Sequence, residues 1–214
     1  MYKFNGGVRM KLVIATLNKK KAEEIQRIAN KIGGRKIEAL CLSDIPEVQG
    51  VPQAEENGKT FLENARKKAT YWEKILNMPV LAEDSGLEID ALDGAPGVYT
   101  KRCMATLCPG EDINVDKPGE LYPKLLTLMS ESGKSTRIAY WVSTVSLVFP
   151  ETYPIDIQCK TRGKMCECAG EREFGFDQYF KPDGQSKTLA EMTPEEKDLI
   201  GPRLKAIKQV FQTL

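Results

Sequence analysis

The sequence predicts an α/β fold in which a mixed central sheet is flanked by helices. Short apolar runs with strand character alternate with stretches whose apolar residues recur at helical spacing. Two longer apolar runs are separated by a short turn with Pro150 and Pro154, which predicts an antiparallel strand pair in the same protein. The 214 residues, 41% of them hydrophobic, suffice for one substantial core. We therefore expect a single domain over residues 1–214, with 1–9 as an N-terminal extension.

The amino-terminal part predicts a strand, a helix and a second strand. Residues 11–16 (KLVIAT) form a short apolar run, and a basic, helix-favouring stretch follows over 19–32. Gly33 and Gly34 end that helix, and the alternating residues 36–42 (KIEALCL) predict the next strand.

A second helix is predicted over residues 61–76. Thr60 and Glu63 match a capping box, in which a hydroxyl and a carboxylate accept hydrogen bonds from free N–H groups of the first turn. Apolar residues then recur at core spacing, at Phe61, Ala65, Ala69, Trp72 and Leu76. We expect this face to pack on the core and Lys67 and Lys68 to lie on other faces.

The next strand is predicted to end at acidic residues. Residues 79–83 (PVLAE) predict a buried strand that ends in a turn at Asp84-Ser85-Gly86, and 87–92 continue as a strand or loop. A carboxylate directly after a buried strand is partly shielded from water, so it needs hydrogen bonds, a metal or a cation. Asp84 is therefore a candidate functional residue.

The carboxyl-terminal half predicts a helix over 118–131, a long strand over 136–149 and its antiparallel partner over 153–161. Thr193 and Glu196 match a second capping box, with Pro194 at the first position of a helix that runs through Ile200. Pro202 begins a fresh helix, whose core-facing residues are Leu204, Ile207, Val210 and Phe211.

Composition excludes several classes of site and partner. No histidine is present, which removes Ser-His-Asp and Cys-His nucleophilic sites and histidine metal ligands. The six cysteines contain no C-x-x-C pair, which argues against structural zinc. With 31 Lys and Arg against 30 Asp and Glu, the chain lacks the positive charge of a generic nucleic-acid or membrane-surface binder. No run approaches the ~20 apolar residues of a membrane span, so we expect a cytoplasmic protein.

Four groups of residues could carry chemistry. Thr16, Asn18 and Lys21 surround a strand-to-helix turn, where free N–H groups favour an anion such as phosphate. Carboxylates suited to Mg²⁺ lie near the second helix and the strand that follows it: Glu55, Glu56, Glu63, Glu83, Asp84 and Asp90. A glycine-containing segment at 94–102 ends in two cations. Aromatic and charged residues suited to a base follow at 174–177, with Lys197 and Arg203 further on.

Together these motifs resemble the inosine triphosphate pyrophosphatase family, hydrolases of aberrant purine nucleoside triphosphates. The resembling segments are TLNKKK at 16–21, EENGKTFLENARKKA at 55–69, LAEDSGLEIDALDGAPGVYTKR at 81–102, FGFD at 174–177 and KTLAEMTPEEKDLIGPR at 187–203. They span nearly the whole chain, in the family's order and spacing. The resemblance implies an elongated, two-lobed domain with an active-site cleft, and a homodimer. It also implies Mg²⁺-dependent hydrolysis of nucleoside triphosphates such as ITP, dITP or XTP to the monophosphate and pyrophosphate.

Each matching residue acquires an implied role. The phosphates would be held by Thr16, Asn18, Lys21 and Lys68, and Ser85 would contact the substrate. Glu56 and Asp84 would bind Mg²⁺, and Asp84 would also orient or deprotonate the attacking water. The base and sugar end would be formed by Phe174, Gly175, Phe176, Asp177, Lys197 and Arg203. Glu47 is a second candidate for the metal ligand, although the twelve-residue spacing to Lys68 favours Glu56.

One motif departs from the family pattern, since Gly201-Pro202-Arg203 stands where the family usually has Ser-His-Arg. Gly replaces Ser at a helix end at small cost and Pro suits the first helical turn, so we expect the fold to survive. Loss of the imidazole hydrogen bond would weaken base discrimination by roughly 1–3 kcal/mol unless another donor such as Arg203 replaces it. Phe176 and Gln178, where the family usually has Tyr and Pro, also alter the base pocket.

Three alternatives stay open beside this hypothesis. The first is a pyrophosphatase with shifted base specificity. The second is a nucleotide-binding or sensing protein without turnover, which the missing histidine motivates. The third is a nucleic-acid-binding module, which the charge balance disfavours.

Overall fold

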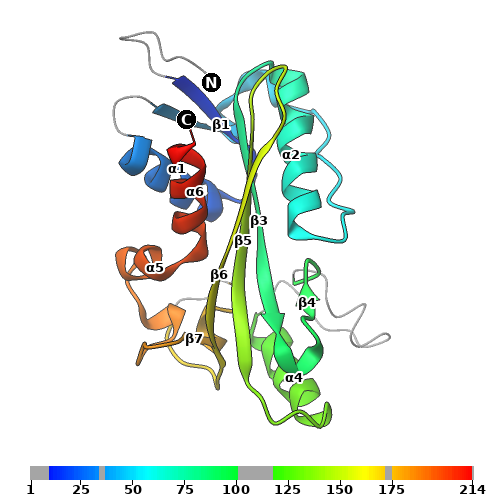
Figure 1. Cartoon of the computed structure of the whole chain (residues 1–214), viewed down its shortest axis with the longest axis vertical. Coiled ribbons are helices and arrows are strands. Elements are labelled where there is room, and N and C mark those ends of the chain that lie inside the picture. The colour runs from blue at the N-terminus through cyan, green and yellow to red at the C-terminus, as the bar shows by residue number, and fades with distance from the viewer. Residues whose placement is uncertain (1–9, 34–36, 101–117, 172–174, 214) are drawn as a thin grey trace. The chain divides into compact units, whose positions relative to one another are not determined.

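A computed structural model describes residues 10–33, 37–100, 118–171 and 175–213, and it confirms the predicted mixed sheet (Figure 1). The strand order is β2-β1-β3-β5-β6-β7, and β4 pairs with β3. β1 pairs in parallel with β2 and β3, whereas the β3–β4 and β6–β7 pairs are antiparallel. The strands are β1 (Met10–Ile14), β2 (Ile37–Cys41), β3 (Val80–Ile89), β4 (Pro96–Gly97), β5 (Ile138–Val148), β6 (Ile155–Met165) and β7 (Phe180–Pro182).

The helices begin and end close to the predicted positions. They are α1 (Lys19–Gly33), α2 (Phe61–Leu76), α4 (Pro118–Glu131), α5 (Pro194–Ile200) and α6 (Pro202–Gln212). Short 3-10 helices cover Leu42–Asp44, Pro46–Val48, Asp90–Leu92, Asp177–Tyr179 and Leu189–Glu191. Among the helices in the described part of the chain, none has both the length and the apolar character that crossing a bilayer requires.

The chain divides into two compact units, and β3, β5 and β6 contribute residues to both. The first unit contains Met1–Asp84, Ser143–Cys159 and Arg203–Leu214, and the second contains Ser85–Val142 and Lys160–Pro202. The predicted extension at 1–9 lies outside the described residues.

In the first unit, helices cover both faces of the sheet (Figure 1). Successive residues of β1 point to opposite faces, so Leu12 and Ile14 pack with α1 and α6, while Val13 packs with α2. The second unit has its own core, in which Leu121, Tyr122 and Leu125 of α4 pack with β3, β5 and the aromatic residues at 176–180.

The structure corrects the prediction of a turn at Asp84-Ser85-Gly86, because β3 runs through these residues without a break. β1 pairs only with the first part of β3, at Val80 and Leu81, while β5 lies along the other side of β3. Strand pairing therefore overrides the turn preference of Asp, Ser and Gly. Asp84 lies beyond the end of β1, and not at the end of its own strand.

The cap of helix α2 forms as predicted at Thr60, whose Oγ1 accepts from the Glu63 N–H at 3.1 Å. The Glu63 carboxylate, however, accepts from the Lys59 N–H at 2.6 Å.

The structure also corrects the expected position of Lys68 on α2. Lys68 was expected to lie away from the core, and its side chain is buried. It lies three residues after Ala65 and four before Trp72, on the same face of the helix, so the apolar face of α2 also carries a cation.

Candidate active site

Lys68 brings together two of the predicted metal ligands. Its Nζ donates to the backbone carbonyl oxygen of Glu83 at 2.9 Å and lies 3.0 Å from Oε1 of Glu56 and 3.9 Å from Oδ1 of Asp84. The Lys68 and Asp84 side chains are 11% and 12% exposed, so water screens their interaction little, whereas the Glu56 side chain is 44% exposed. Glu56 and Asp84 are separated by 28 positions in the sequence and meet through this one ammonium group.

Glu83 is buried in a network of charges behind this group. Its Oε1 accepts hydrogen bonds from Ser143 Oγ at 2.7 Å and Arg203 Nη2 at 3.2 Å, and its Oε2 accepts from Lys21 Nζ at 3.1 Å. Burial alone would raise the pKa of Glu83, but the charges of Arg203 and Lys21 outweigh it and hold the pKa well below its usual range. Glu83 therefore stays ionised and fixes two cations that sequence analysis assigned to the substrate.

Arg203 is enclosed by acidic partners in the first unit. Its side chain is 2% exposed, and its Nη1 lies 2.5 Å from Oε2 of Glu24. Burial opposes the charged form, but Glu83 and Glu24 overcome this effect and raise the pKa of Arg203. In this arrangement the guanidinium is paired with the Glu24 and Glu83 carboxylates. The expected contact between Arg203 and the base end of a nucleotide stays a prediction.

Asp84 is mostly buried, and a side-chain amide fixes its carboxylate. Asn64 Nδ2 donates to Asp84 Oδ2 at 3.0 Å. Burial raises the pKa of Asp84, and the positive charges of Lys68 and Lys21 partly offset the increase. A buried carboxylate with a raised pKa is a candidate proton acceptor in catalysis.

Asn18 caps helix α1, and Thr16 bonds to Asn18. Thr16 Oγ1 accepts from the Asn18 N–H, and Asn18 Oδ1 accepts from the Lys21 N–H, both at 3.2 Å. Their side chains therefore have a structural role in this state, and they stand at the helix end that favours an anion. Lys21 extends from the first turn of α1 to Glu83.

The oxygen atoms around Lys68 suit a hard divalent cation. No group of three or more Cys, Asp or Glu side chains with metal-binding geometry occurs among the described residues. Mg²⁺ does not require one, since it commonly uses one or two carboxylates and takes its other ligands from water and substrate phosphates. Glu56 and Asp84 fit that pattern. Glu47 is exposed on the short helix Pro46–Val48, and no hydrogen bond or ion pair in the described ranges links it to Lys68 or Asp84.

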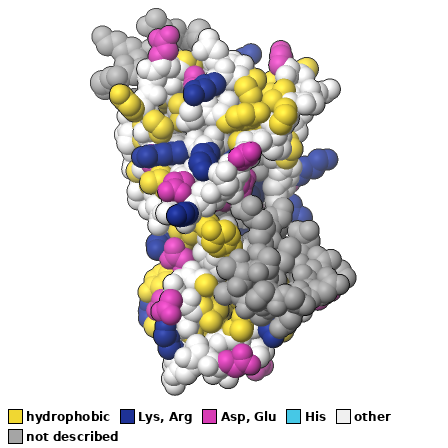
Figure 2. Space-filling view, turned by 90° about the vertical axis from the view of Figure 1, so that its right-hand side faces the viewer, with side chains coloured by type: hydrophobic (Ala, Val, Ile, Leu, Met, Phe, Trp, Pro, Cys, Tyr) yellow, Lys and Arg dark blue, Asp and Glu magenta, His cyan; other side chains and the backbone are white. Residues whose placement is uncertain are grey.

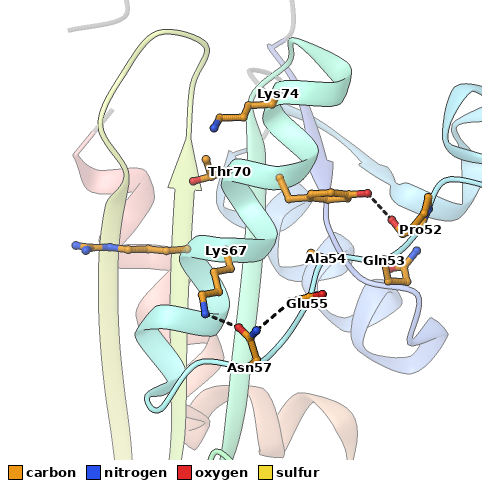
Figure 3. A pocket seen from close by; sticks show the side chains of 10 residues that line it. Pro52, Gln53, Ala54, Glu55, Asn57, Lys67, Thr70 and Lys74 are labelled. Carbon is orange, nitrogen blue, oxygen red and sulfur yellow. Dashed lines mark hydrogen bonds between the residues drawn. The ribbon is translucent and has the colours of Figure 1, made fainter.

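A groove lies between residues 52–57 and helix α2 (Figure 3). It has a volume of about 870 Å³; the candidate carboxylate Glu55 lines it, but none of the residues to which the family resemblance gives a role does. Lys67 Nζ donates to Asn57 Oδ1 at 2.6 Å, and Tyr71 Oη donates to the Pro52 carbonyl at 2.7 Å. These contacts fasten residues 52–57 to α2. Glu55 and Asn57 line the groove, while Glu56 between them pairs with Lys68.

The second unit contains a separate charged pair supported by aromatic rings. Lys197 Nζ and Asp177 Oδ2 lie 2.5 Å apart, and their side chains are 13% and 7% exposed. The Lys197 ammonium also lies 5.2 Å from the centre of the Trp141 ring, and that ring meets Phe176 edge to face at 6.1 Å. Gly175 is exposed, Ser85 is half-buried, and Phe174 lies outside the described residues.

Sequence analysis missed several residues that hold the candidate site in place, among them Asn64, Ser143, Glu24 and Trp141. Asn64 had a detectable signal, since it lies three residues after Phe61 and four before Lys68 on the buried face of α2. Ser143 and Trp141 had no such signal, because small or aromatic residues in a long apolar strand are ordinary core residues.

Charges of both signs are interspersed on the face of the molecule shown in Figure 2. Among the described residues on that face, Lys and Arg side chains form no continuous band. This distribution fits the balanced overall charge of the chain.

Comparisons with known proteins agree with the motifs and with the fold. The family model described as the Ham1 family matches residues 12–213. A dITP/XTP pyrophosphatase of Aquifex aeolicus is 36% identical over 209 residues, covering 96% of each chain, and one of Mycobacteroides abscessus is 34% identical over 206 residues, covering 96% of this chain and 95% of the relative. The structure of a HAM1 protein from Coxiella burnetii is 28% identical, with a TM-score of 0.78 over 96% of this chain and 100% of that one. The chain therefore belongs to the Ham1 family, as its resemblance to inosine triphosphate pyrophosphatases predicts.

Proposed function

We propose that this protein hydrolyses nucleoside triphosphates with non-standard purine bases, such as dITP and XTP, to the monophosphate and pyrophosphate in the presence of Mg²⁺. The observation that carries the proposal is the group in which the buried Lys68 joins the buried Asp84 and the more exposed Glu56. Such a group offers carboxylates for a divalent cation and an ammonium for a phosphate. The substrate class is supported by the relatives named dITP/XTP pyrophosphatase.

At the phosphate end, Glu56 and Asp84 would hold Mg²⁺, which when bound offsets phosphate charge and lowers the pKa of a bound water. Lys21 and Lys68 would contact phosphate oxygens, with Thr16 and Asn18 at the start of α1. Asp84 would orient the attacking water and accept its proton, a role that its burial supports because burial raises the pKa of its carboxyl group.

At the base and sugar end, we propose roles for Lys197 and Asp177, with Phe174, Gly175 and Phe176 beside them and Ser85 on the substrate. The short Lys197–Asp177 contact and the low exposure of both side chains support a preorganised pair of hydrogen-bonding groups. Arg203 would act on the reaction by holding Glu83, because its guanidinium is buried against that carboxylate. We also propose that the protein acts as a homodimer in the cytoplasm, as the family resemblance implies.

The test compares the wild type with Asp84→Asn on a panel of ITP, dITP, XTP and the common triphosphates, resolving pyrophosphate from orthophosphate. We expect pyrophosphate from the non-standard purines, and a loss of about 10²- to 10⁴-fold in kcat for the variant. Asp93→Asn is a matched control, because the Asp93 side chain is 88% exposed and pairs with Lys134. Orthophosphate as the product, or tight nucleotide binding without turnover, would contradict the proposal and favour another phosphatase chemistry or a sensing protein.

A further inference from the structure

Asn64 is a buried amide with both of its polar atoms in use. It lies in the first turn of α2 and is 0% exposed. Its Oδ1 accepts a hydrogen bond from the Gly58 N–H at 2.8 Å, and its Nδ2 donates to Asp84 Oδ2 at 3.0 Å. Since a backbone N–H can only donate, the Gly58 bond fixes which end of the amide faces Asp84. The donor is thereby aimed at the carboxylate.

The two bonds of Asn64 lead to the two candidate metal ligands. Asp84 is contacted directly, and Gly58 lies two residues after Glu56 in the segment that precedes α2. That segment has no regular secondary structure, so its position depends on side-chain contacts. Lys67 and Tyr71 fasten it on the groove side, and Asn64 and Lys68 fasten it on the side of Asp84.

Close packing at Gly58 shows how tightly this junction is built. A Cβ atom added at Gly58 would lie 2.6 Å from Asn64 Oδ1 and 2.7 Å from Glu63 Cβ. Both distances are far below ordinary van der Waals contact, so only glycine lets the backbone approach the amide this closely. Glycine at position 58 therefore lets the segment that carries Glu56 pack directly against Asn64.

From this geometry we propose that Asn64 is a positioning residue. It holds Asp84 and the segment that carries Glu56 at the relative positions in which both carboxylates can bind one divalent cation. The inference rests on the proposed function and deepens it. The amide occupies Oδ2 of Asp84, so the carboxylate is held with Oδ1 towards Lys68. Partners of metal ligands that fix their orientation commonly change metal affinity or activity by about 10- to 100-fold.

The experiment measures Mn²⁺ binding to the full chain by electron paramagnetic resonance without nucleotide, together with kcat and KM for dITP. The variants are Asn64→Leu, which has a similar size and removes both bonds, and Gly58→Ala, which leaves Asn64 intact and displaces the segment. Gln26→Leu is the matched control, because it removes an amide that donates to the Ala39 carbonyl at 2.9 Å in the same unit. Thermal unfolding of each variant separates loss of stability from loss of the site.

We expect Asn64→Leu and Gly58→Ala to weaken Mn²⁺ binding and to lower kcat/KM for dITP by about 10- to 100-fold. Gln26→Leu should lower stability and leave both readouts at the wild-type level. The inference is overturned if both test variants bind Mn²⁺ as the wild type does, or if the wild type binds no Mn²⁺. If Asn64→Leu does not fold, Gly58→Ala decides alone. A wild type that binds Mn²⁺ but hydrolyses no triphosphate would refute the proposed function, and the Mn²⁺ comparison would still test Asn64.

Discussion

Replacing Gly201 with alanine should destabilise the second unit, because Trp141 already fills the space beside that glycine. An added Cβ would lie 2.9 Å from the Lys197 carbonyl oxygen and 3.0 Å from Cη2 of Trp141. The carbonyl cannot easily move, since it accepts the Gly201 N–H at 2.9 Å at the end of α5. The indole is 4% exposed and packs against Phe176, so it has little room to withdraw.

Two opposing effects set the size of this change. The backbone at Gly201 has φ −64° and ψ 144°, which alanine adopts without strain. The substitution would therefore by itself stabilise the folded protein by about 0.4–1 kcal/mol, because alanine lowers the conformational entropy of the unfolded chain. Overpacking a filled site costs about 1–3 kcal/mol. We therefore expect a net loss of about 1–2 kcal/mol in the free energy of unfolding.

A double-mutant cycle with Trp141→Phe identifies the cause, with urea denaturation as the assay. Cη2 and Cζ3 belong to the six-membered ring of the indole, and phenylalanine leaves that space open. In the Trp141→Phe background, Gly201→Ala should be neutral or stabilising, which corresponds to a coupling of at least about 1 kcal/mol. An equal cost in both backgrounds, or no cost in the wild type, would refute the reasoning.

Three further predictions concern the charged groups. Lys68→Met should lower kcat/KM for dITP by about 10²- to 10³-fold, while Lys67→Met, whose ammonium binds Asn57 in the groove, should change it little. Glu83→Gln should lower the free energy of unfolding by up to about 3–5 kcal/mol in urea, because Arg203 would lose a buried partner. The control is the more exposed pair of Glu88 with Lys160, where Glu88→Gln should lower the free energy of unfolding by only about 0–1 kcal/mol. Equal losses of stability in the two variants would contradict the role of Glu83. Lys197→Met should lower kcat/KM for dITP by about 10- to 100-fold and reduce the preference for dITP over dGTP, with the Mg²⁺ requirement unchanged. An unaltered preference, or the same loss in the exposed Lys187→Met, would count against that assignment.

The elements of this fold were predictable wherever local signals and packing agree. Helix α2 has a cap at Thr60 and an apolar face through Trp72, and it forms over the predicted residues. The prediction failed at Asp84-Ser85-Gly86, where three turn-favouring residues lie inside β3. Pairing with β5 depends on residues some 50 positions further along the chain, and a local pattern cannot reveal it.

The same distinction explains which parts of the candidate site could be found. The motifs gave Glu56, Lys68 and Asp84, and the structure brings these side chains together at Lys68. The partners that fix them come from distant elements, such as Ser143 on β5 and Glu24 on α1. Gly201 illustrates the limit most clearly. From sequence, glycine in place of serine is a mild change at a helix end. In the structure, the ring of Trp141 occupies the space that a side chain at position 201 would need.

The charges around Asp84 indicate why a cation and the substrate should depend on each other. Four carboxylates, Glu24, Glu56, Glu83 and Asp84, surround three cations, Lys21, Lys68 and Arg203. Each lysine that we assign to phosphate is already paired with a carboxylate, Lys21 with Glu83 and Lys68 with Glu56. A triphosphate alone would add negative charge to a group that already has a small excess of it, which is unfavourable in a poorly screened site. Lys68 can turn to a phosphate at low cost only when another cation neutralises Glu56. Nucleotide binding should therefore weaken strongly without a divalent cation, and far less so in a Glu56→Gln variant, where Lys68 no longer has the Glu56 carboxylate, its nearer acidic partner, to leave.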